Sequence, residues 1–253
     1  MTDSHVHVGW FVDRYHSPDD VTVQLRSVGV KSVLISSTST CAEDYDLVLH
    51  EMEWLQDEWQ ENLIPALWIT PRMLKEGKLQ YMLDSGVPWK ALKMHWQAHT
   101  EFFSAPDLVE TVLTDSRLVK LPILLHTGRF PECEACVFER LIAHYPDRTF
   151  ILAHGRPLDD TILILNKYNN VYVDTAFMPI SDIMRLIDAN LAKRILWGSD
   201  APINEHFFSA QPTTVYLSRR IEDLRTSITA QQFRDITEHN FYDIFNSNKT
   251  TRL

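Results

Sequence analysis

Eight short runs of β-forming residues, each followed by a segment with helical character, constrain the fold of this chain more than any other feature. Several of the runs are apolar at nearly every position, which is typical of parallel strands covered on both faces. The alternation of strands and helices therefore predicts an α/β protein with a parallel sheet. The runs cover residues 4–8, 31–37, 63–69, 89–95, 122–127, 149–155, 171–176 and 194–200.

The segments between these runs are mostly amphipathic, with apolar residues at helical spacing. The clearest cover residues 42–62, 131–145 and 179–193, and residues 229–245 form a closing segment of the same kind. Eight βα units within 253 residues predict a (β/α)8 TIM barrel that spans residues 1–253 as a single domain. An open doubly wound sheet is the alternative, but it favours a Gly-rich turn after the first strand, where only Gly9 occurs.

The composition limits the partners and the location of the protein. Acidic residues outnumber basic ones by 34 to 24, the formal charge is −10, and no basic stripe could follow a phosphate backbone. No apolar run reaches the roughly 20 residues that cross a bilayer, and the first residues do not read as a signal peptide. We therefore expect a soluble, cytoplasmic protein that binds neither nucleic acid nor membranes.

Polar residues gather at the C-terminal ends of the predicted strands. In a barrel, this face carries the active site, and the side chains there point toward a common axis. One histidine at a strand end is commonly structural, but here several separate strands end in neutral imidazole or carboxylate groups, which divalent metal ions prefer. The pattern therefore predicts a metal site. The residues concerned are His5, His7, Lys93, His95, His126, His154 and Asp200.

Four short motifs resemble those of the amidohydrolase superfamily. They are "DSHVH", "LLHTG", "ILAHG" and "WGSDAP", which correspond in order to its H-x-H, fifth-strand His, sixth-strand His and eighth-strand Asp. The "GSD" ending and the "HNFYDIF" tail are most similar to its amidohydrolase-related branch, which includes proteins like aminocarboxymuconate semialdehyde decarboxylase. The resemblance extends from Asp3 to Phe245, and its specificity lies in the order and spacing of the motifs.

This resemblance implies that His5, His7, His126 and Asp200 hold a divalent metal ion. One Zn²⁺ is expected, although Mn²⁺ and similar ions accept the same ligands. Asp200 would also act as the catalytic acid and base for a metal-activated water. His154 would be catalytic as well, either as a further ligand or as the group that polarises a substrate oxygen.

Four further residues are predicted to bind substrate. Lys93 pairs with a substrate carboxylate or with Asp200, or it is a carboxylated bridge to a second metal ion, as in the family's two-metal members. His95 shares the strand face of Lys93 and either lines the site or supports a ligand from behind. Arg129 and Arg156 lie on loops at the same face and could hold a carboxylate, or they could be surface residues.

We therefore predict a metal-dependent hydrolase that acts on a small-molecule amide, ester or lactone, and a carboxylate on the substrate would suit the two arginines. A decarboxylase or hydratase of the same branch is the first alternative, and a non-catalytic metal- or ligand-binding barrel is the second. Aromatic residues on the loops could wall the pocket or form the interface of a homodimer. The sequence leaves open the substrate and whether Asp174 faces the pocket or caps a helix.

Cys133 and Cys136 form a C-x-x-C pair without a second pair elsewhere in the sequence. Since a structural zinc site requires four ligands, we interpret them as two small residues of a helix.

Overall fold

The computed structural model describes residues 1–128, 130–207 and 211–246. Within these residues, the strands form one curled sheet in the order β2-β1-β3-β4-β5-β6-β7-β8-β9. Every pairing is parallel except that of β2 with β1, which is an antiparallel hairpin. The strands are β1 (Thr2–Phe11), β2 (Arg14–His16), β3 (Ser32–Ser37), β4 (Leu63–Trp68), β5 (Ala91–Met94), β6 (Ile123–His126), β7 (Phe150–Ala153), β8 (Val171–Asp174) and β9 (Ile195–Leu196).

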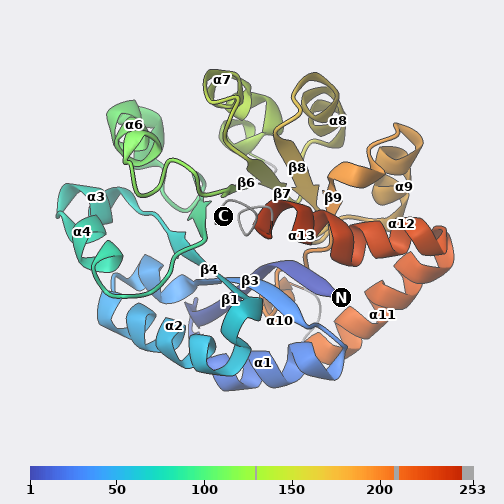
Figure 1. Cartoon of the computed structure of the whole chain (residues 1–253), viewed down its shortest axis with the longest axis horizontal. Coiled ribbons are helices and arrows are strands. Elements are labelled where there is room, and N and C mark those ends of the chain that lie inside the picture. The colour runs from blue at the N-terminus through green and yellow to red at the C-terminus, as the bar shows by residue number, and fades with distance from the viewer. Residues whose placement is uncertain (129, 208–210, 247–253) are drawn as a thin grey trace, which may run out of the picture.

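Each of the eight predicted runs contains one strand of the sheet or lies within one, and β2 is an addition that the sequence did not predict. The prediction of an α/β protein with a curled, barrel-like sheet is confirmed. Figure 1 shows the strands gathered at the centre of the molecule, with helices arranged around them.

The first strand and the segment that follows the last strand are joined by hydrogen bonds rather than by a regular ladder. The N–H of Ser4 donates to Trp197 O, that of Asp200 to His5 O, and that of His7 to Ala201 O, each at 2.8 Å. Val6 and Ala201 form an isolated parallel bridge. These bonds bring the two ends of the sheet together, whereas full closure of an eight-stranded barrel stays a prediction.

The helices surround the sheet in chain order. They are α1 (Pro18–Ser27), α2 (Tyr45–Trp59), α3 (Pro71–Lys75), α4 (Lys78–Leu83), α5 (Glu101–Ser104), α6 (Pro106–Thr114), α7 (Glu139–His144), α8 (Leu158–Lys167), α9 (Ile180–Asp188), α10 (Asn204–Phe207), α11 (Thr213–Ser227), α12 (Ala230–Arg234) and α13 (Asn240–Phe245). In the described part of the chain, none of them combines the length and the apolarity that crossing a membrane requires.

Local side-chain bonds explain where several predicted helices begin. Asp44 caps α2 by accepting from the N–H of Leu47, and Thr229 forms a capping box with Gln232 at the start of α12. The predicted segment 229–245 is divided into α12, a π-helical turn and α13.

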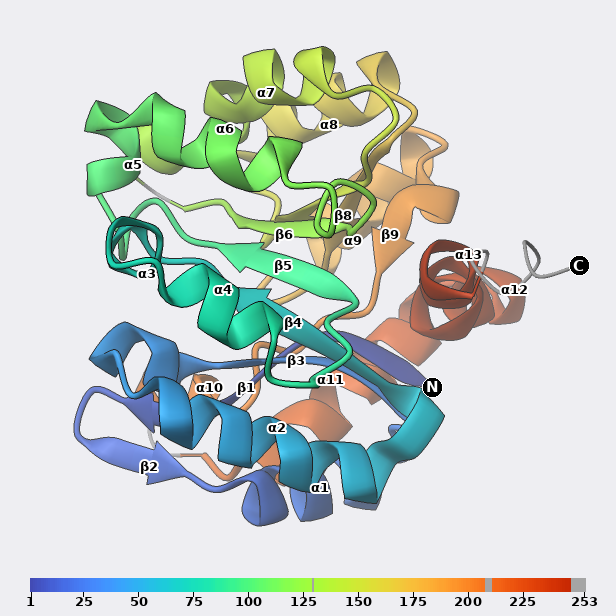
Figure 2. The same ribbon diagram turned by 60° about the vertical axis from the view of Figure 1, so that its left-hand side comes forward.

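Two apolar clusters fill the fold. The larger one lies between the sheet and the surrounding helices, and the smaller one joins strand residues such as Leu34, Leu124 and Leu196 to Phe241 and Ile244 of α13. In Figures 1 and 2, α13 and α10 lie at opposite ends of the strands. Since Phe241 and Ile244 belong to the smaller cluster, α13 covers one end of the curled sheet with apolar side chains and leaves the other end to polar groups.

The surroundings of Gly9, which lies opposite His16 in the β1–β2 hairpin, determine which residue type can occupy its position. Its φ is +95°, which side chains rarely adopt, and a Cβ at this position would lie 2.4 Å from Ser39 Oγ. The hairpin therefore packs against Ser39 closely enough to require glycine.

We expect Gly9→Ala to lower the free energy of unfolding by roughly 2–4 kcal/mol, because it adds a steric clash to the backbone strain. Gly29→Ala is the matched control, since Gly29 has a φ of +86° but no atom within 4 Å of its would-be Cβ. That variant should lose only about 1–2 kcal/mol. Urea denaturation measures both, and equal losses would contradict the close packing of the hairpin.

Candidate active site

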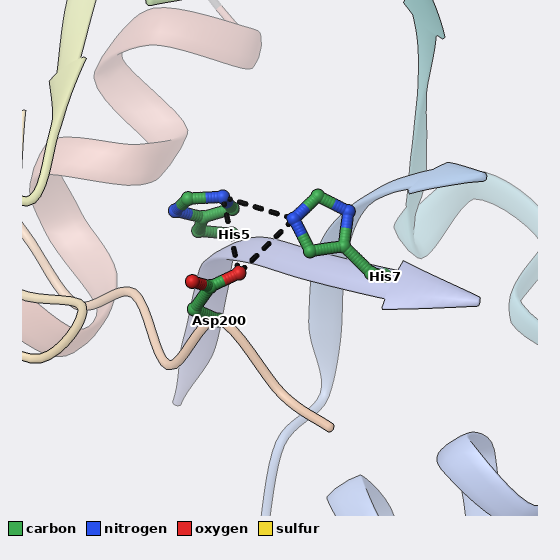
Figure 3. A group of neighbouring side chains, drawn as sticks. All are labelled: His5, His7 and Asp200. Carbon is green, nitrogen blue, oxygen red and sulfur yellow. Dashed lines mark hydrogen bonds and ion pairs between the residues drawn. The ribbon is translucent and has the colours of Figure 1, made fainter. Parts of the chain in front are cut away.

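Three ligand-type side chains converge beside the middle of the first strand (Figure 3). His5 and His7 are two residues apart on β1, which continues to Phe11 beyond the predicted strand end, and Asp200 lies four residues after β9 and is held there by the bond from its N–H to His5 O. His5 Nε2 lies 3.2 Å from His7 Nε2, and Asp200 Oδ1 lies 3.4 Å and 3.0 Å from these two nitrogens. All three residues are buried.

The other ring nitrogens of the two histidines show which atoms carry hydrogen. His5 Nδ1 lies 2.9 Å from Asp174 Oδ2, and His7 Nδ1 lies 3.0 Å from Ser36 Oγ and 3.3 Å from Ser36 O. The Asp174 carboxylate can only accept, so the ring of His5 donates from Nδ1 and keeps a lone pair on Nε2. For His7, the Ser36 hydroxyl can accept or donate but the Ser36 carbonyl can only accept, which favours the same tautomer. Burial, followed by the charge of Lys93, lowers the pKa of His5 well below its usual range, which agrees with a neutral ring.

Three acceptor atoms therefore face one another with no hydrogen between them. Lys93 donates to one of the three, His5 Nε2, and a divalent cation between them would satisfy all three. Donors placed tetrahedrally about 2.0–2.1 Å from a zinc ion lie about 3.3 Å apart, close to the distances in this group. The group of His5, His7 and Asp200 thus fits a divalent metal ion both in chemistry and in spacing.

Lys93 places a positive charge beside this group. Its Nζ lies 3.0 Å from His5 Nε2, and its side chain, on β5, is fully buried. Burial lowers the pKa of Lys93 to about 8. The sequence-based prediction placed Lys93 in the site, and the structure brings it next to the donor group.

His154 follows β7 and adopts a positive φ of 69°. Its backbone N–H donates to Asp174 Oδ1 at 3.0 Å, and its Nδ1 donates to Ala176 O at 3.1 Å. The Nε2 lone pair consequently faces Asp200 Oδ2 at 3.8 Å. His154 thus lies in the same cavity beside Asp200, and its role as a further ligand or as a polarising group stays a prediction.

His126, the fourth predicted ligand, lies in the same cavity but outside the three-donor group. Its Nε2 lies 3.3 Å from Gln97 Oε1, and its ring stacks on that of His95 with centroids 3.6 Å apart. Ligation by His126 stays a prediction.

One cavity of about 660 Å³ joins all of these residues. Phe11, Phe177 and Phe207 contribute apolar walls, and Asp200 is the one carboxylate among the described lining residues. The cavity is lined by every predicted site residue that the structure describes, namely His5, His7, Lys93, His95, His126, His154, Arg156 and Asp200. Arg129 lies outside the described residues.

Two buried carboxylates complete the site. Asp174 caps no helix, since its carboxylate accepts from His5 and from the backbone N–H of His154. Its position at the end of a predicted strand is the sequence feature that pointed to a place in the site. Asp3 was not predicted to be a site residue, although it is two residues before His5, the spacing at which side chains of a strand share a face. Asp3 Oδ1 accepts from the N–H groups of His5 at 3.2 Å and Ser199 at 3.0 Å, and so ties β1 to the segment that carries Asp200.

The C-x-x-C pair does not act as a unit. Cys133 is buried and Cys136 is exposed, both as free thiols on short 3-10 turns rather than on one helix. The pair was predicted to lie on a helix, which is wrong because segment 131–145 forms two such turns before α7 begins.

We expect Asp174→Asn to weaken zinc binding about 10- to 100-fold, because the amide nitrogen cannot accept the hydrogen of His5 Nδ1. Competition with a chromophoric chelator measures the affinity. Asp57→Asn, an exposed change on α2, should bind zinc as the wild type does. If Asp174→Asn retained full affinity, the tautomer of His5 would not depend on Asp174.

Comparisons with known proteins identify the family and the fold. The amidohydrolase family model (Amidohydro_2) matches residues 119–246. No curated protein matches the sequence. A probable 2-pyrone-4,6-dicarboxylic acid hydrolase from Acinetobacter baumannii, solved with citric acid bound, is similar in structure with a TM-score of 0.68 and 10% identity, over 97% of this chain and 98% of that one.

Two further solved structures share the fold. An amidohydrolase from Burkholderia multivorans with bound zinc has a TM-score of 0.67 and 12% identity, over 97% of this chain and 98% of that one. The 4-oxalomesaconate hydratase from Rhodopseudomonas palustris has a TM-score of 0.57 and 14% identity, over 91% and 81%. With the family model matching half of the sequence, the chain belongs to the amidohydrolase family.

Proposed function

We propose that this protein is a metal-dependent hydrolase of a small, carboxylate-bearing ester, lactone or amide. The observation that carries the proposal is the convergence of His5 Nε2, His7 Nε2 and Asp200 Oδ1, three buried acceptors without a shared hydrogen, beside a cavity of small-molecule size. Such a group suits a divalent cation, and hydrolysis is a reaction that a divalent cation promotes.

His5, His7 and Asp200 would hold the ion, with His126 as the predicted fourth ligand. When bound, a divalent ion supplies a Lewis acid and lowers the pKa of water from about 16 to about 7. We propose zinc, because two imidazoles and a carboxylate are ligands that zinc accepts, and a zinc-containing amidohydrolase shares the fold.

Asp200 carries the proton in this proposal. Its Oδ1 faces the two histidines, and its Oδ2 points toward His154 and remains available to accept the proton of the attacking water. The same oxygen would return that proton to the leaving group. His154 lies 3.8 Å away, close enough to orient the carboxylate and to meet a substrate oxygen as negative charge develops on it.

The charges around the cavity support an anionic substrate. Lys93 and Arg156 bring positive charge to the lining, against the single carboxylate of Asp200 among the described lining residues. A substrate carboxylate would bind to these cations, and its apolar part would contact Phe11 and Phe177. Citric acid bound to a structural neighbour is consistent with this choice.

The metal content is the first test. Protein purified without chelators should contain about one equivalent of zinc by elemental analysis, and a His5→Ala/His7→Ala double variant should lose it. About two equivalents would make Lys93 a bridging ligand to a second ion. No metal in the wild type, even after reconstitution with zinc or manganese, would overturn the proposed mechanism.

The reaction is the second test. We expect zinc-loaded protein to hydrolyse members of a panel of carboxylate-bearing lactones, esters and amides, and Asp200→Asn to lower kcat/KM by about 10²- to 10⁴-fold, because the proton acceptor is lost. Asp57→Asn should retain full activity. Release of CO2 or hydration of an unsaturated acid in the same screen, without hydrolysis, would identify a decarboxylase or hydratase instead.

A further inference from the structure

The ring of His95 is held between two other rings on neighbouring strands. Trp68 ends β4, His95 follows β5, and His126 ends β6. The ring of His95 is nearly parallel to both neighbours, 5.7 Å from Trp68 with 6° between the planes and 3.6 Å from His126 with 12°. Trp68 is itself anchored, because its indole N–H donates to His99 Nε2 at 3.2 Å. The stack therefore fixes the plane of the His95 ring.

A backbone hydrogen bond fixes the tautomer of the same ring. The N–H of Ala98 donates to His95 Nδ1 at 3.1 Å, in the turn that follows β5. A nitrogen that accepts a hydrogen bond carries no hydrogen of its own, so the ring is neutral and its hydrogen lies on Nε2. Within the described residues, no side chain or carbonyl accepts from this Nε2–H, and the ring lines the cavity.

This arrangement is the reverse of that in His5, His7 and His154. Those rings donate from Nδ1 to Asp174, Ser36 O and Ala176 O respectively, and each presents an Nε2 lone pair to the site. We infer that His95 is an uncharged hydrogen-bond donor of the cavity, which presents its Nε2–H to an oxygen of the bound substrate beside the cationic donors Lys93 and Arg156. The inference rests on the proposed function, because it places a substrate oxygen in this cavity.

The tautomer can be read without any substrate. In zinc-loaded, ¹⁵N-labelled protein, a two-bond ¹H–¹⁵N correlation spectrum distinguishes protonated from unprotonated ring nitrogens, and the signals lost in His95→Gln identify His95. We expect hydrogen on Nε2 and none on Nδ1. Hydrogen on Nδ1 would overturn the inference, and this result does not depend on whether the protein is a hydrolase.

The donor role is tested by the binding of benzoate, a planar carboxylate, to zinc-loaded protein in a calorimetric titration. His95→Phe keeps a ring in the stack without a donor and should weaken binding at least tenfold. His95→Gln keeps an N–H donor and should bind within about threefold of the wild type. His50→Phe, an exposed change on α2, should have no effect.

Two results would contradict the donor role. Wild-type affinity in His95→Phe would show that the N–H does not contribute, and equal losses in the Phe and Gln variants would show that only the shape of the imidazole matters. If the wild type did not bind benzoate, both the donor role and the proposed carboxylate on the substrate would be contradicted. The hydrolase proposal would still be decided separately, by the metal content of the protein.

Discussion

The site depends on three acceptor atoms that are held close together although their lone pairs repel one another. His5 Nε2, His7 Nε2 and Asp200 Oδ1 remain near one another because each residue is fixed from behind. Asp174 takes the hydrogen of His5, and Ser36 O takes that of His7. The free energy that assembles this group comes from the packed sheet and its buried hydrogen bonds. A metal ion would thus meet a site that is already arranged.

The contact between the two ends of the sheet also holds the donor group in place. The backbone of β1 bonds the segment after β9 at Ser4, His5 and His7, and Asp3 adds a side-chain bond to Ser199. The same hydrogen bonds therefore bring together the ends of the sheet and the candidate metal ligands. A change that loosens this contact would alter the separation of Asp200 from the two histidines before it altered the rest of the core.

The sequence was sufficient to predict every strand of the described residues except β2, and the face of the sheet on which the cavity lies. Apolar runs locate β3 to β9, and polar residues at their ends identify the cavity, since the carboxyl ends of parallel strands meet at one edge. The sequence could not predict which nitrogen of each ring carries hydrogen. For His95 the partner is a backbone group, Ala98 N–H, and for His7 it is both the hydroxyl and the carbonyl of Ser36, a residue of another strand whose place beside the ring the sequence pattern does not reveal. The period of the strands also could not show that the His126 ring lies outside the group of His5, His7 and Asp200. The direction of that ring depends on its stacking against His95.

The apolar cap that α13 forms has a consequence for how a substrate reaches the cavity. Phe241 and Ile244 cover the end of the sheet opposite α10, whereas Phe11 at the end of β1 and Phe207 in α10 line the cavity. A substrate would therefore approach the donor group from the end of the strands that carries α10. The helix that packs under the sheet and the segments that meet a substrate lie at opposite ends, so changes in α13 would alter stability rather than access to the cavity.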